Sequence, residues 1–222
     1  MSAAHLLEDG LVALDLALSA ATRTRLLDYI ALLVKWNRTY NLTAIRDECD
    51  MVTQHLLDSL SVLPQLKKIL ACGSALTVKP RRLADVGSGA GLPGIPLAIA
   101  CAETSPELVV TLIETVEKKS AFQRQVKIEL GLDNVLVASS RVEDLPGGVF
   151  DAVISRAFAN LEDFVRLAGH LPAPGGVLCA MKGHVIPAEM ERLPSPWRIR
   201  QCLPLQVPGL DARRHLIVLE NV

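Results

Sequence analysis

Three glycines at alternate positions, Gly87, Gly89 and Gly91, follow directly after the apolar residues that begin at Leu83. Because glycine has no Cβ, its backbone can adopt positive φ and can approach a ligand that a larger residue would push away. The stretch 83–96 therefore predicts a strand, a tight turn and a helix whose N-terminus holds a nucleotide-like cofactor. A strand-to-helix turn without a ligand would use the same residues, so the surrounding sequence has to decide between the two.

Two classes of cofactor compete for this loop. Gly89-Ala-Gly91-Leu-Pro-Gly94 fits the G-x-G-x-x-G pattern of dinucleotide-binding folds, and Glu114 follows roughly 20 residues later, where either class uses an acid to bind ribose hydroxyls. Asp85 and the pair Glu143-Asp144 add carboxylates at two further predicted strand ends. A carboxylate would repel the pyrophosphate of NAD but attract the ammonium group of S-adenosylmethionine or its water shell. The residues therefore favour S-adenosylmethionine over NAD.

The rest of the sequence supplies the elements that must position these groups. Apolar runs alternate with helical patterns, which is typical of a mostly parallel, doubly wound α/β sheet. The predicted strands are 82–86, 108–113, 134–138, 150–155 and 177–181, and the helices between them include 117–130 and 161–171. Residues 208–212 alone separate two further strand candidates, 197–207 and 213–219, so they predict a hairpin whose last strand is antiparallel. Parallel strands closed by such a hairpin are the arrangement of the class I methyltransferase fold.

The N-terminal region follows a different pattern. Apolar residues such as Leu26 and Ile30 recur at helical spacing, so residues 1–70 predict a helical extension. A shift toward glycine, serine and proline predicts a connection at 71–81. The S-adenosylmethionine-binding domain is then expected over 82–222.

Composition limits the classes of partner. The 222 residues carry a formal net charge of −1, with a pI of about 6.5, so any contact with RNA must come from a local basic patch. The five cysteines contain no Cys-x-x-Cys pair and His55 has no ligand-spaced partner, so no metal site is predicted. Acidic residues interrupt the N-terminal apolar region, and no apolar run approaches membrane-spanning length. We expect a cytoplasmic monomer without a membrane contact.

Several longer segments form a characteristic series. They are Trp36-Asn-Arg-Thr-Tyr-Asn-Leu-Thr-Ala-Ile45, His55-Leu-Leu-Asp-Ser-Leu60, Asp85-Val-Gly-Ser-Gly-Ala-Gly-Leu-Pro-Gly-Ile-Pro-Leu97, Ser140-Arg-Val-Glu143, Phe150-Asp-Ala-Val-Ile-Ser-Arg-Ala-Phe158 and Met181-Lys-Gly183. Together they cover much of the chain, and their order resembles that of the bacterial 16S ribosomal RNA guanine-N7 methyltransferases, also called glucose-inhibited division protein B. Many methyltransferases share the glycine-rich segment, whereas the first segment combined with Ser-Arg-Ala-Phe is much more specific.

The resemblance implies a reaction and a set of residues. The reaction is transfer of a methyl group from S-adenosylmethionine to N7 of one guanine in the decoding-region loop of 16S ribosomal RNA, within the small ribosomal subunit or an assembly intermediate. The cofactor-binding residues expected from the resemblance and from the loop are Asp85, Gly87, Gly89, Leu92, Glu114, Val142, Glu143 and Arg156. Many relatives have Phe in place of Leu92 and Ala in place of Val142, which puts affinity rather than activity in doubt.

The chemistry at guanine N7 determines which residues are needed to bind the base that accepts the methyl group. N7 has an available lone pair and no proton to lose, so attack on the sulfonium methyl requires positioning and no general base. Arg156 is the main candidate, because a guanidinium group can meet guanine O6 or a nearby phosphate without blocking N7. Lys182 and Arg141, with Lys118, follow predicted strands, where they would meet RNA phosphates.

Other interpretations stay open on the sequence alone. The chain could methylate a small molecule or a protein, bind an adenosine ligand without turnover, or act as an NAD-dependent oxidoreductase. His55 is expected to pack with a hydrogen bond rather than to act as a base, and Trp36 and Tyr40 are expected to contact the core rather than to stack on a base. Simple exposure or local pairing is expected for Arg38, Arg46, Arg213 and Arg214.

Overall fold

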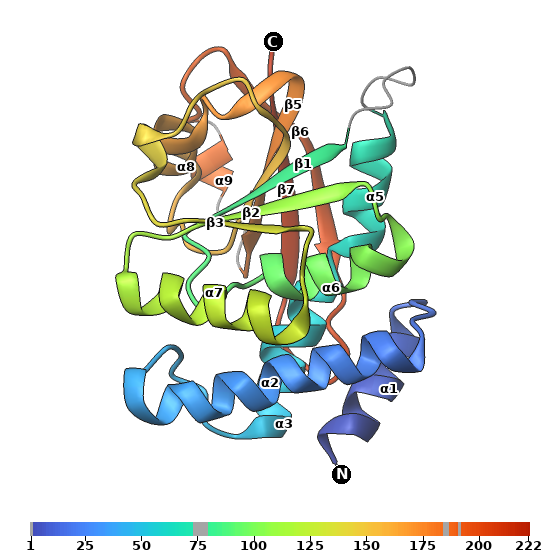
Figure 1. Cartoon of the computed structure of the whole chain (residues 1–222). Helices are drawn as coiled ribbons and strands as arrows, with labels where there is room; N and C mark the ends of the chain where they lie inside the picture. The colour runs from blue at the N-terminus through green and yellow to red at the C-terminus, as the bar shows by residue number, and fades with distance from the viewer. Residues whose placement is uncertain (1, 73–79, 184–186, 191) are drawn as a thin grey trace.

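The computed structural model describes residues 2–72, 80–183, 187–190 and 192–222. Its strands form one seven-stranded sheet in the order β3-β2-β1-β4-β5-β7-β6 (Figure 1). The strands are β1 (Arg81–Val86), β2 (Leu108–Ile113), β3 (Val135–Ala138), β4 (Phe150–Ser155), β5 (Pro172–Lys182), β6 (Trp197–Leu205) and β7 (Arg214–Asn221). Strands β1 to β5 are parallel, and β7 runs antiparallel to both β5 and β6. The predicted parallel sheet with an antiparallel hairpin is confirmed.

Helices cover both faces of this sheet. They are α1 (Ala3–Ala13), α2 (Ala20–Tyr40), α3 (Glu48–Met51), the π-helical segment η1 (Val52–Leu57), α4 (Asp58–Leu60), α5 (Leu63–Cys72), α6 (Gly94–Thr104), α7 (Glu117–Leu130), the 3₁₀ segment η2 (Val142–Asp144), α8 (Leu161–Ala168) and α9 (Pro187–Met190). Successive strand residues point to opposite faces. Leu83 therefore joins a core cluster with the N-terminal helices, α6 and α7, whereas Ala84 joins a second cluster with α8.

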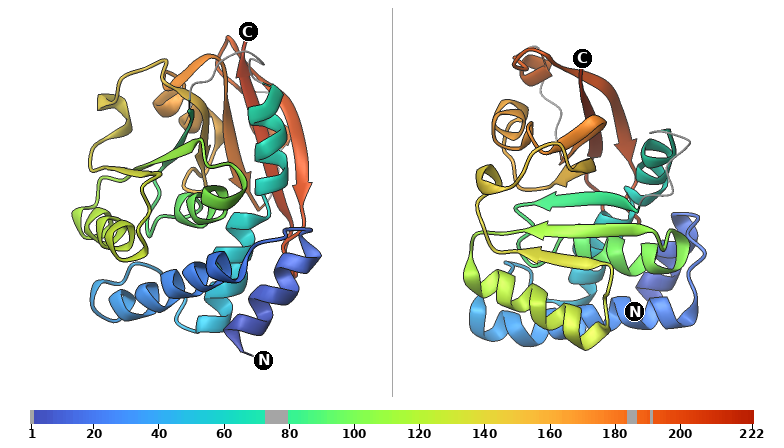
Figure 2. Two further views of the ribbon diagram at one scale, coloured as in Figure 1. Left: turned by 45° about the vertical axis from the view of Figure 1, so that its right-hand side comes forward. Right: turned by 45° about the horizontal axis from the view of Figure 1, so that its top comes forward.

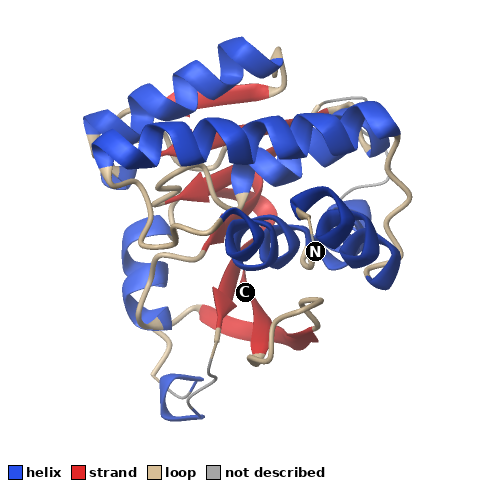
Figure 3. Ribbon diagram, turned by 90° about the horizontal axis from the view of Figure 1, so that it is seen from below, coloured by secondary structure: helices blue, strands red, loops and turns tan. Residues whose placement is uncertain are grey.

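The N-terminal helices share one hydrophobic core with the sheet. Helix α2 packs against α6 and α7, and Figures 2 and 3 show the N-terminal helices running across this side of the molecule. Glu103 at the end of α6 accepts hydrogen bonds from the N–H and hydroxyl of Ser19 and from the hydroxyl of Thr22, which fixes the start of α2. In the middle of α2, the buried hydroxyl of Tyr29 donates to the carbonyl of Ala90 at 2.9 Å. The extension is thereby tied directly to the glycine-rich loop.

Of the two aromatic residues at the end of α2, Trp36 packs against the core as expected, whereas the expectation was wrong for Tyr40, which is 42% exposed at the helix end. The ring of Trp36 lies 5.1 Å from that of Tyr40 and 5.6 Å from that of Phe122 in α7. The predicted connection at 71–81 lies partly outside the described residues, because 73–79 are not described; α5 ends at Cys72 and β1 begins at Arg81. Within the described part of the chain, no helix is both long enough and apolar enough to cross a membrane.

Candidate functional site

A cleft of about 490 Å³ opens at the carboxyl ends of the parallel strands. In α/β sheets this edge is where ligands bind. The cleft lies between the glycine-rich loop, the helical segment 54–58, and the residues that follow β4 and β5. Its lining residues are Leu42, Thr43, Ile45, Gln54, His55, Asp58, Gly87, Ser88, Gly89, Ala90, Leu92, Arg156, Ala157, Met181, Gly183 and Arg214. Of the residues predicted from the sequence, Gly87, Gly89, Leu92 and Arg156 line it.

The glycine-rich loop has the backbone conformation that its composition predicts. Gly87, Gly89 and Gly91 have φ values of 68°, 58° and 88°, a region that other residues rarely adopt. A Cβ on Gly87 would lie 2.7 Å from the Cβ of Ala157, so the loop passes too close to the residues after β4 to admit a side chain. Of the atoms that the structure describes, a Cβ on Gly89 would meet only the carbonyl oxygen of Gly87, at 4.0 Å, and it would project into open space. The loop is therefore packed from behind and open toward the cleft.

Asp85 stabilises the glycine-rich loop through a hydrogen bond to the start of α6. Its side chain is fully buried, and its Oδ2 accepts a hydrogen bond of 2.7 Å from the N–H of Gly94 at the start of α6. Burial raises the pKa of Asp85 to about 7, although the Gly94 N–H and the charge of Arg156 oppose that shift. Among the described residues, the second oxygen, Oδ1, has no hydrogen-bond partner. Asp85 stands at the predicted strand end, behind the loop rather than among the residues that line the cleft.

Glu114 holds the same loop from the end of β2. Its Oε2 accepts from the N–H of Gly89 at 2.8 Å and its Oε1 from the N–H of Val116 at 2.9 Å. Gln123 of α7 adds hydrogen bonds of 2.8 Å to the hydroxyl of Ser88 and to the carbonyl of Gly89. Gly89 is thus held through both its N–H and its carbonyl.

The third predicted acidic position lies at the same edge of the sheet, beyond the cleft lining. Val142 and Glu143 belong to η2, which follows β3. The side chain of Val142 is buried, whereas Arg141 and Glu143 are exposed. All three lie outside the set of residues that lines the cleft.

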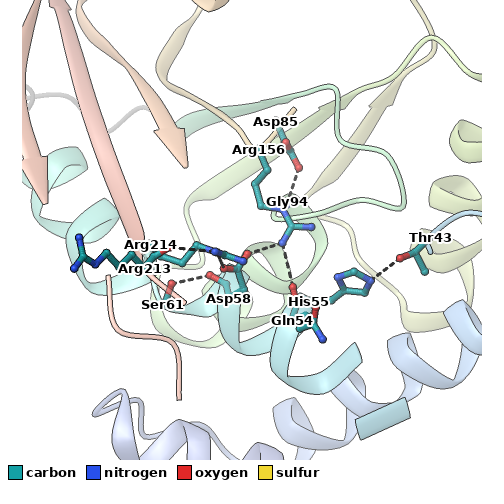
Figure 4. Close-up of polar contacts among 10 residues, drawn as sticks. All are labelled: Thr43, Gln54, His55, Asp58, Ser61, Asp85, Gly94, Arg156, Arg213 and Arg214. Carbon is teal, nitrogen blue, oxygen red and sulfur yellow. Dashed lines mark hydrogen bonds and ion pairs between the residues drawn. The ribbon is translucent and has the colours of Figure 1, made fainter. Parts of the chain in front are cut away.

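Arg156 meets a carboxylate that the sequence analysis did not single out. Its Nη1 lies 2.7 Å from Oδ2 of Asp58 and also donates to the carbonyl of Gln54 at 3.5 Å. The other oxygen of Asp58 accepts from Nε of Arg214 at 2.9 Å. Figure 4 shows Asp58 between the two guanidinium groups. Three segments far apart in the chain therefore meet at one side of the cleft.

A π-helical segment brings Asp58 to this position. The helix that starts at Glu48 widens over Val52–Leu57 and returns to α-helical geometry at Asp58. Such π segments are rare and occur frequently at functional sites. Leu56 and Leu57 stay in the core, while Gln54, His55 and Asp58 line the cleft.

His55 packs with a hydrogen bond, as the sequence predicted. Its Nε2 lies 2.9 Å from Oγ1 of Thr43, and burial together with the charge of Arg156 lowers the pKa of His55 to about 4. Thr43 is held in turn by the buried Asn37, whose Oδ1 accepts from the Thr43 N–H at 2.9 Å. At neutral pH the His55 ring is uncharged.

Lys182 lies beside the cleft in a network of its own. Its Nζ donates to the carbonyl of Ala159 at 2.6 Å and lies 2.5 Å from Oε2 of Glu189 in α9. The cleft-lining residues Met181 and Gly183 flank it. Lys182 therefore links the loop after β4 to α9.

The sequence analysis did not predict a role for Asp58, and its prediction for Arg214 was wrong. For Arg214 we expected exposure or local pairing, yet it pairs with a carboxylate 156 positions earlier and lines the cleft. The signal for Asp58 was present, because a charged residue inside the apolar run from Leu56 to Leu60 needs a partner when it is buried. Local pairing does hold for Arg46, whose Nη2 donates to Oδ1 of Asn41 at 2.8 Å.

Comparison with known proteins identifies the family. The profile described as rRNA small subunit methyltransferase G matches residues 22–217. The chain belongs to this family. Proteins named Ribosomal RNA small subunit methyltransferase G from Aromatoleum aromaticum and Azoarcus sp. are 56% and 54% identical to it, over 100% and 96% of this chain and 100% and 94% of theirs. A protein of the same name from Burkholderia thailandensis is 54% identical over 97% of this chain and 90% of its own length.

Solved structures agree on the fold. TrmN from Thermus thermophilus has a TM-score of 0.54 and 21% identity, over 77% of this chain and 53% of that chain. A SAM dependent methyltransferase from Aquifex aeolicus has a TM-score of 0.53 and 15% identity, over 73% and 92%. These likenesses concern the fold alone. The class I fold and the resemblance to the rRNA small subunit methyltransferase G family, both expected from the sequence, are confirmed.

The residues fit the cofactor of an S-adenosylmethionine-dependent methyltransferase, the class to which the family belongs. The cleft has the volume of a small-molecule site. Gly89 leaves open space where any other residue would place a Cβ, and the buried carboxylates Asp85 and Glu114 fix the loop without entering that space. Among the described residues, no group of three or more His, Cys, Asp and Glu side chains is arranged to hold a metal ion.

Proposed function

We propose that this member of the rRNA small subunit methyltransferase G family transfers a methyl group to N7 of a guanine in the decoding-region loop of 16S ribosomal RNA. The observation that carries the proposal is the arrangement of one cleft, with the open glycine-rich loop on one side and the guanidinium groups of Arg156 and Arg214 on the other. The names of the relatives, which specify the small-subunit ribosomal RNA, support the class of acceptor.

Direct in-line transfer without a general base suits both the acceptor and the cleft. When bound, S-adenosylmethionine supplies a methyl group on a positively charged sulfur, and guanine N7 offers a lone pair without a proton to remove. Asp58, the carboxylate that lines the cleft, is engaged by two arginines, and His55 is engaged by Thr43. The task left to the protein is to align the nucleophile with the methyl group.

We assign the two halves of the cleft to the two substrates. The cofactor is held by the loop residues Gly87, Gly89 and Leu92, supported by Asp85, and its adenosine extends toward Glu114, Val142 and Glu143 along the same edge of the sheet. Arg156 stands where the two halves meet, and it donates to guanine O6 or to a neighbouring phosphate. Lys182 and Arg141, with Lys118, extend the positive charge toward the RNA backbone.

The test is methyl transfer to ribosomal subunits. Small subunits purified from cells that lack this protein are incubated with radiolabelled S-adenosylmethionine and the enzyme, with large subunits as the control. The labelled nucleotide is then identified after digestion. We expect 7-methylguanosine in small-subunit RNA. Label in another nucleotide would refute the N7 acceptor; absence of label from subunits and assembly intermediates, with cofactor binding intact, would favour a small-molecule or protein acceptor.

A further inference from the structure

Asp58 is a buried carboxylate that pairs with two arginines on the side of the cleft assigned to the acceptor. Its side chain is 5% exposed, and its two oxygens are divided between Arg156 at 2.7 Å and Arg214 at 2.9 Å. Both arginines are partly exposed to the cleft, with side-chain exposures of 23% and 29%. One carboxylate therefore holds two cations that come from the loop after β4 and from the start of β7.

The two arginines line the cleft, and each keeps a nitrogen that is not used in this arrangement. Arg156 uses Nη1 for Asp58 and Gln54, and Arg214 uses Nε for Asp58 and Nη1 for the carbonyl of Arg213. Nη2 of each arginine makes no hydrogen bond within the described part of the chain. A guanidinium fork fixed along one edge presents its other N–H groups in a defined direction, and acceptors such as guanine O6 or a phosphate oxygen match them.

We propose that Asp58 is a positioning residue, which orients Arg156 and Arg214 so that together they align the guanine nucleotide with the methyl donor. This inference rests on the proposed function. It assigns Asp58 no proton transfer, since N7 has no proton to lose. A π-helical segment, a geometry that is rare and frequent at functional sites, precedes Asp58, and its two partners come from distant parts of the chain.

The substitution Asp58→Asn affects RNA binding and methyl transfer in opposite directions if Asp58 acts by positioning. Asp58→Asn removes the negative charge between two cations, so the cleft becomes more positive and its general attraction for RNA increases. The same change releases both guanidinium groups from a fixed partner and lets them repel each other. If Asp58 acts by positioning, RNA binds as tightly as before or more tightly, yet methyl transfer slows.

A matched control lies at the opposite end of β4. Asp151 also accepts from an arginine, Arg81 at 3.2 Å, and from the N–H of Arg82 at 2.8 Å. It lies at the amino end of the strand that leads to Arg156, away from the cleft. Asp151→Asn therefore makes the same chemical change where no role in methyl transfer is expected.

The experiment compares full-length wild type, Asp58→Asn, Asp58→Glu and Asp151→Asn in single-turnover methylation of small subunits. The Kd for 16S ribosomal RNA and the Kd for S-adenosylhomocysteine are measured on the same samples. For Asp58→Asn we expect the rate of methyl transfer to fall by about 100-fold, the Kd for RNA to stay equal or decrease, and the Kd for S-adenosylhomocysteine to stay within about twofold of wild type. Asp151→Asn is expected to match wild type in all three measurements.

A double variant separates positioning from a structural role. If Asp58 acts through Arg214, the loss caused by Asp58→Asn becomes smaller when Arg214→Gln is already present, and the two losses do not multiply. Asp58→Glu keeps the charge but shifts the carboxylate by one methylene group. Asp58→Glu therefore tests the proposal even if Asp58→Asn fails to fold. We expect its rate of methyl transfer to fall by about tenfold and its Kd for RNA to stay unchanged.

The outcomes distinguish this inference from the proposed function. If wild type transfers no methyl group to small-subunit RNA, the proposed function fails. If wild type is active and the folded Asp58 variants match it in rate, or if their losses in rate follow their losses in cofactor affinity, the positioning role is refuted.

Discussion

Replacing Gly89 with alanine adds one methyl group at the most open position of the glycine-rich loop. The new Cβ would have the carbonyl oxygen of Gly87 as its nearest neighbour, at 4.0 Å, so the described residues offer no steric obstacle. Gly89 lines the cleft, and its N–H and carbonyl are held by Glu114 and Gln123. The methyl group therefore projects into the volume that we assign to the cofactor.

Two separate costs follow from this geometry. Gly89 has a φ of 58°, and an alanine there costs about 1–2 kcal/mol in backbone strain, partly offset by a less flexible unfolded chain. A net loss of about 1 kcal/mol lowers the Tm of a protein of this size by about 2–4 °C. Overlap between the methyl group and the bound cofactor costs a further 1–3 kcal/mol or so. Cofactor affinity is then expected to fall by about 5- to 150-fold.

Gly148→Ala isolates the first cost from the second. Gly148 has a φ of 71°, and a Cβ there would meet no atom of the described chain within 4 Å, but Gly148 lies in the loop before β4 and outside the cleft. Thermal unfolding is measured for both variants, and their affinities for S-adenosylhomocysteine are measured by titration calorimetry. Both variants should lose similar stability, and Gly89→Ala alone should lose affinity. Equal affinities within twofold would refute the assignment of this loop to the cofactor.

Three further predictions concern buried polar groups and the acceptor side. Tyr29→Phe leaves the carbonyl of Ala90 without its buried donor, so urea denaturation should show that the free energy of unfolding falls by about 1–3 kcal/mol. Stability equal to wild type would contradict the role of this hydrogen bond in joining α2 to the glycine-rich loop. Asp85 has a folded-state pKa raised from 3.8 to about 7, so its stabilising contribution is present below pH 3.8 and is lost as the pH rises to about 7. The stability of wild type relative to Asp85→Asn should therefore decrease across this pH range and level off above it; a difference independent of pH would show that Asp85 titrates normally. Arg156→Ala removes donors in the cleft that we assign to the acceptor, so kcat for methylation should fall by at least about tenfold in protein whose circular dichroism spectrum matches wild type. An unchanged kcat would refute this role of Arg156.

The sheet was largely predictable because its signals are local. The strands predicted at 108–113 and 150–155 and the helix predicted at 117–130 have the bounds of β2, β4 and α7. Strands that are covered on both faces form short apolar runs, and such runs are visible without knowledge of their neighbours. The glycine-rich loop was equally predictable, because backbone positions with positive φ favour glycine and the glycines are visible in the sequence.

Features that depend on distant partners were not predictable in the same way. Strand β5 begins at Pro172, earlier than the predicted 177, because the pairing of Pro172 with Phe150 extends a segment whose prolines and glycines carry no strand signal. The π-helical segment η1 depends on packing and leaves no periodic pattern. Asp58 could be recognised as a residue in need of a partner, but Arg156 and Arg214 lie 98 and 156 positions away.

The strand order also determines when each part of the site can be completed. Strand β7 lies between β5 and β6 although it follows both in the chain. On the ribosome, β6 emerges before β7 and has no neighbour in the described sheet with which to pair until β7 arrives. During that interval β5 presents an open edge whose N–H and C=O groups are available to other chains.

The two halves of the cleft are consequently made at different times. Glu114 and Gln123, whose side chains hold Gly89, are synthesised by the middle of the chain, and Val142 and Glu143 follow well before Arg214. Arg214 is the first residue of β7, and Asp58 keeps one oxygen without its arginine until that strand is inserted. The residues that we assign to the methyl donor are therefore synthesised before Arg214, which completes the side of the cleft that we assign to the base.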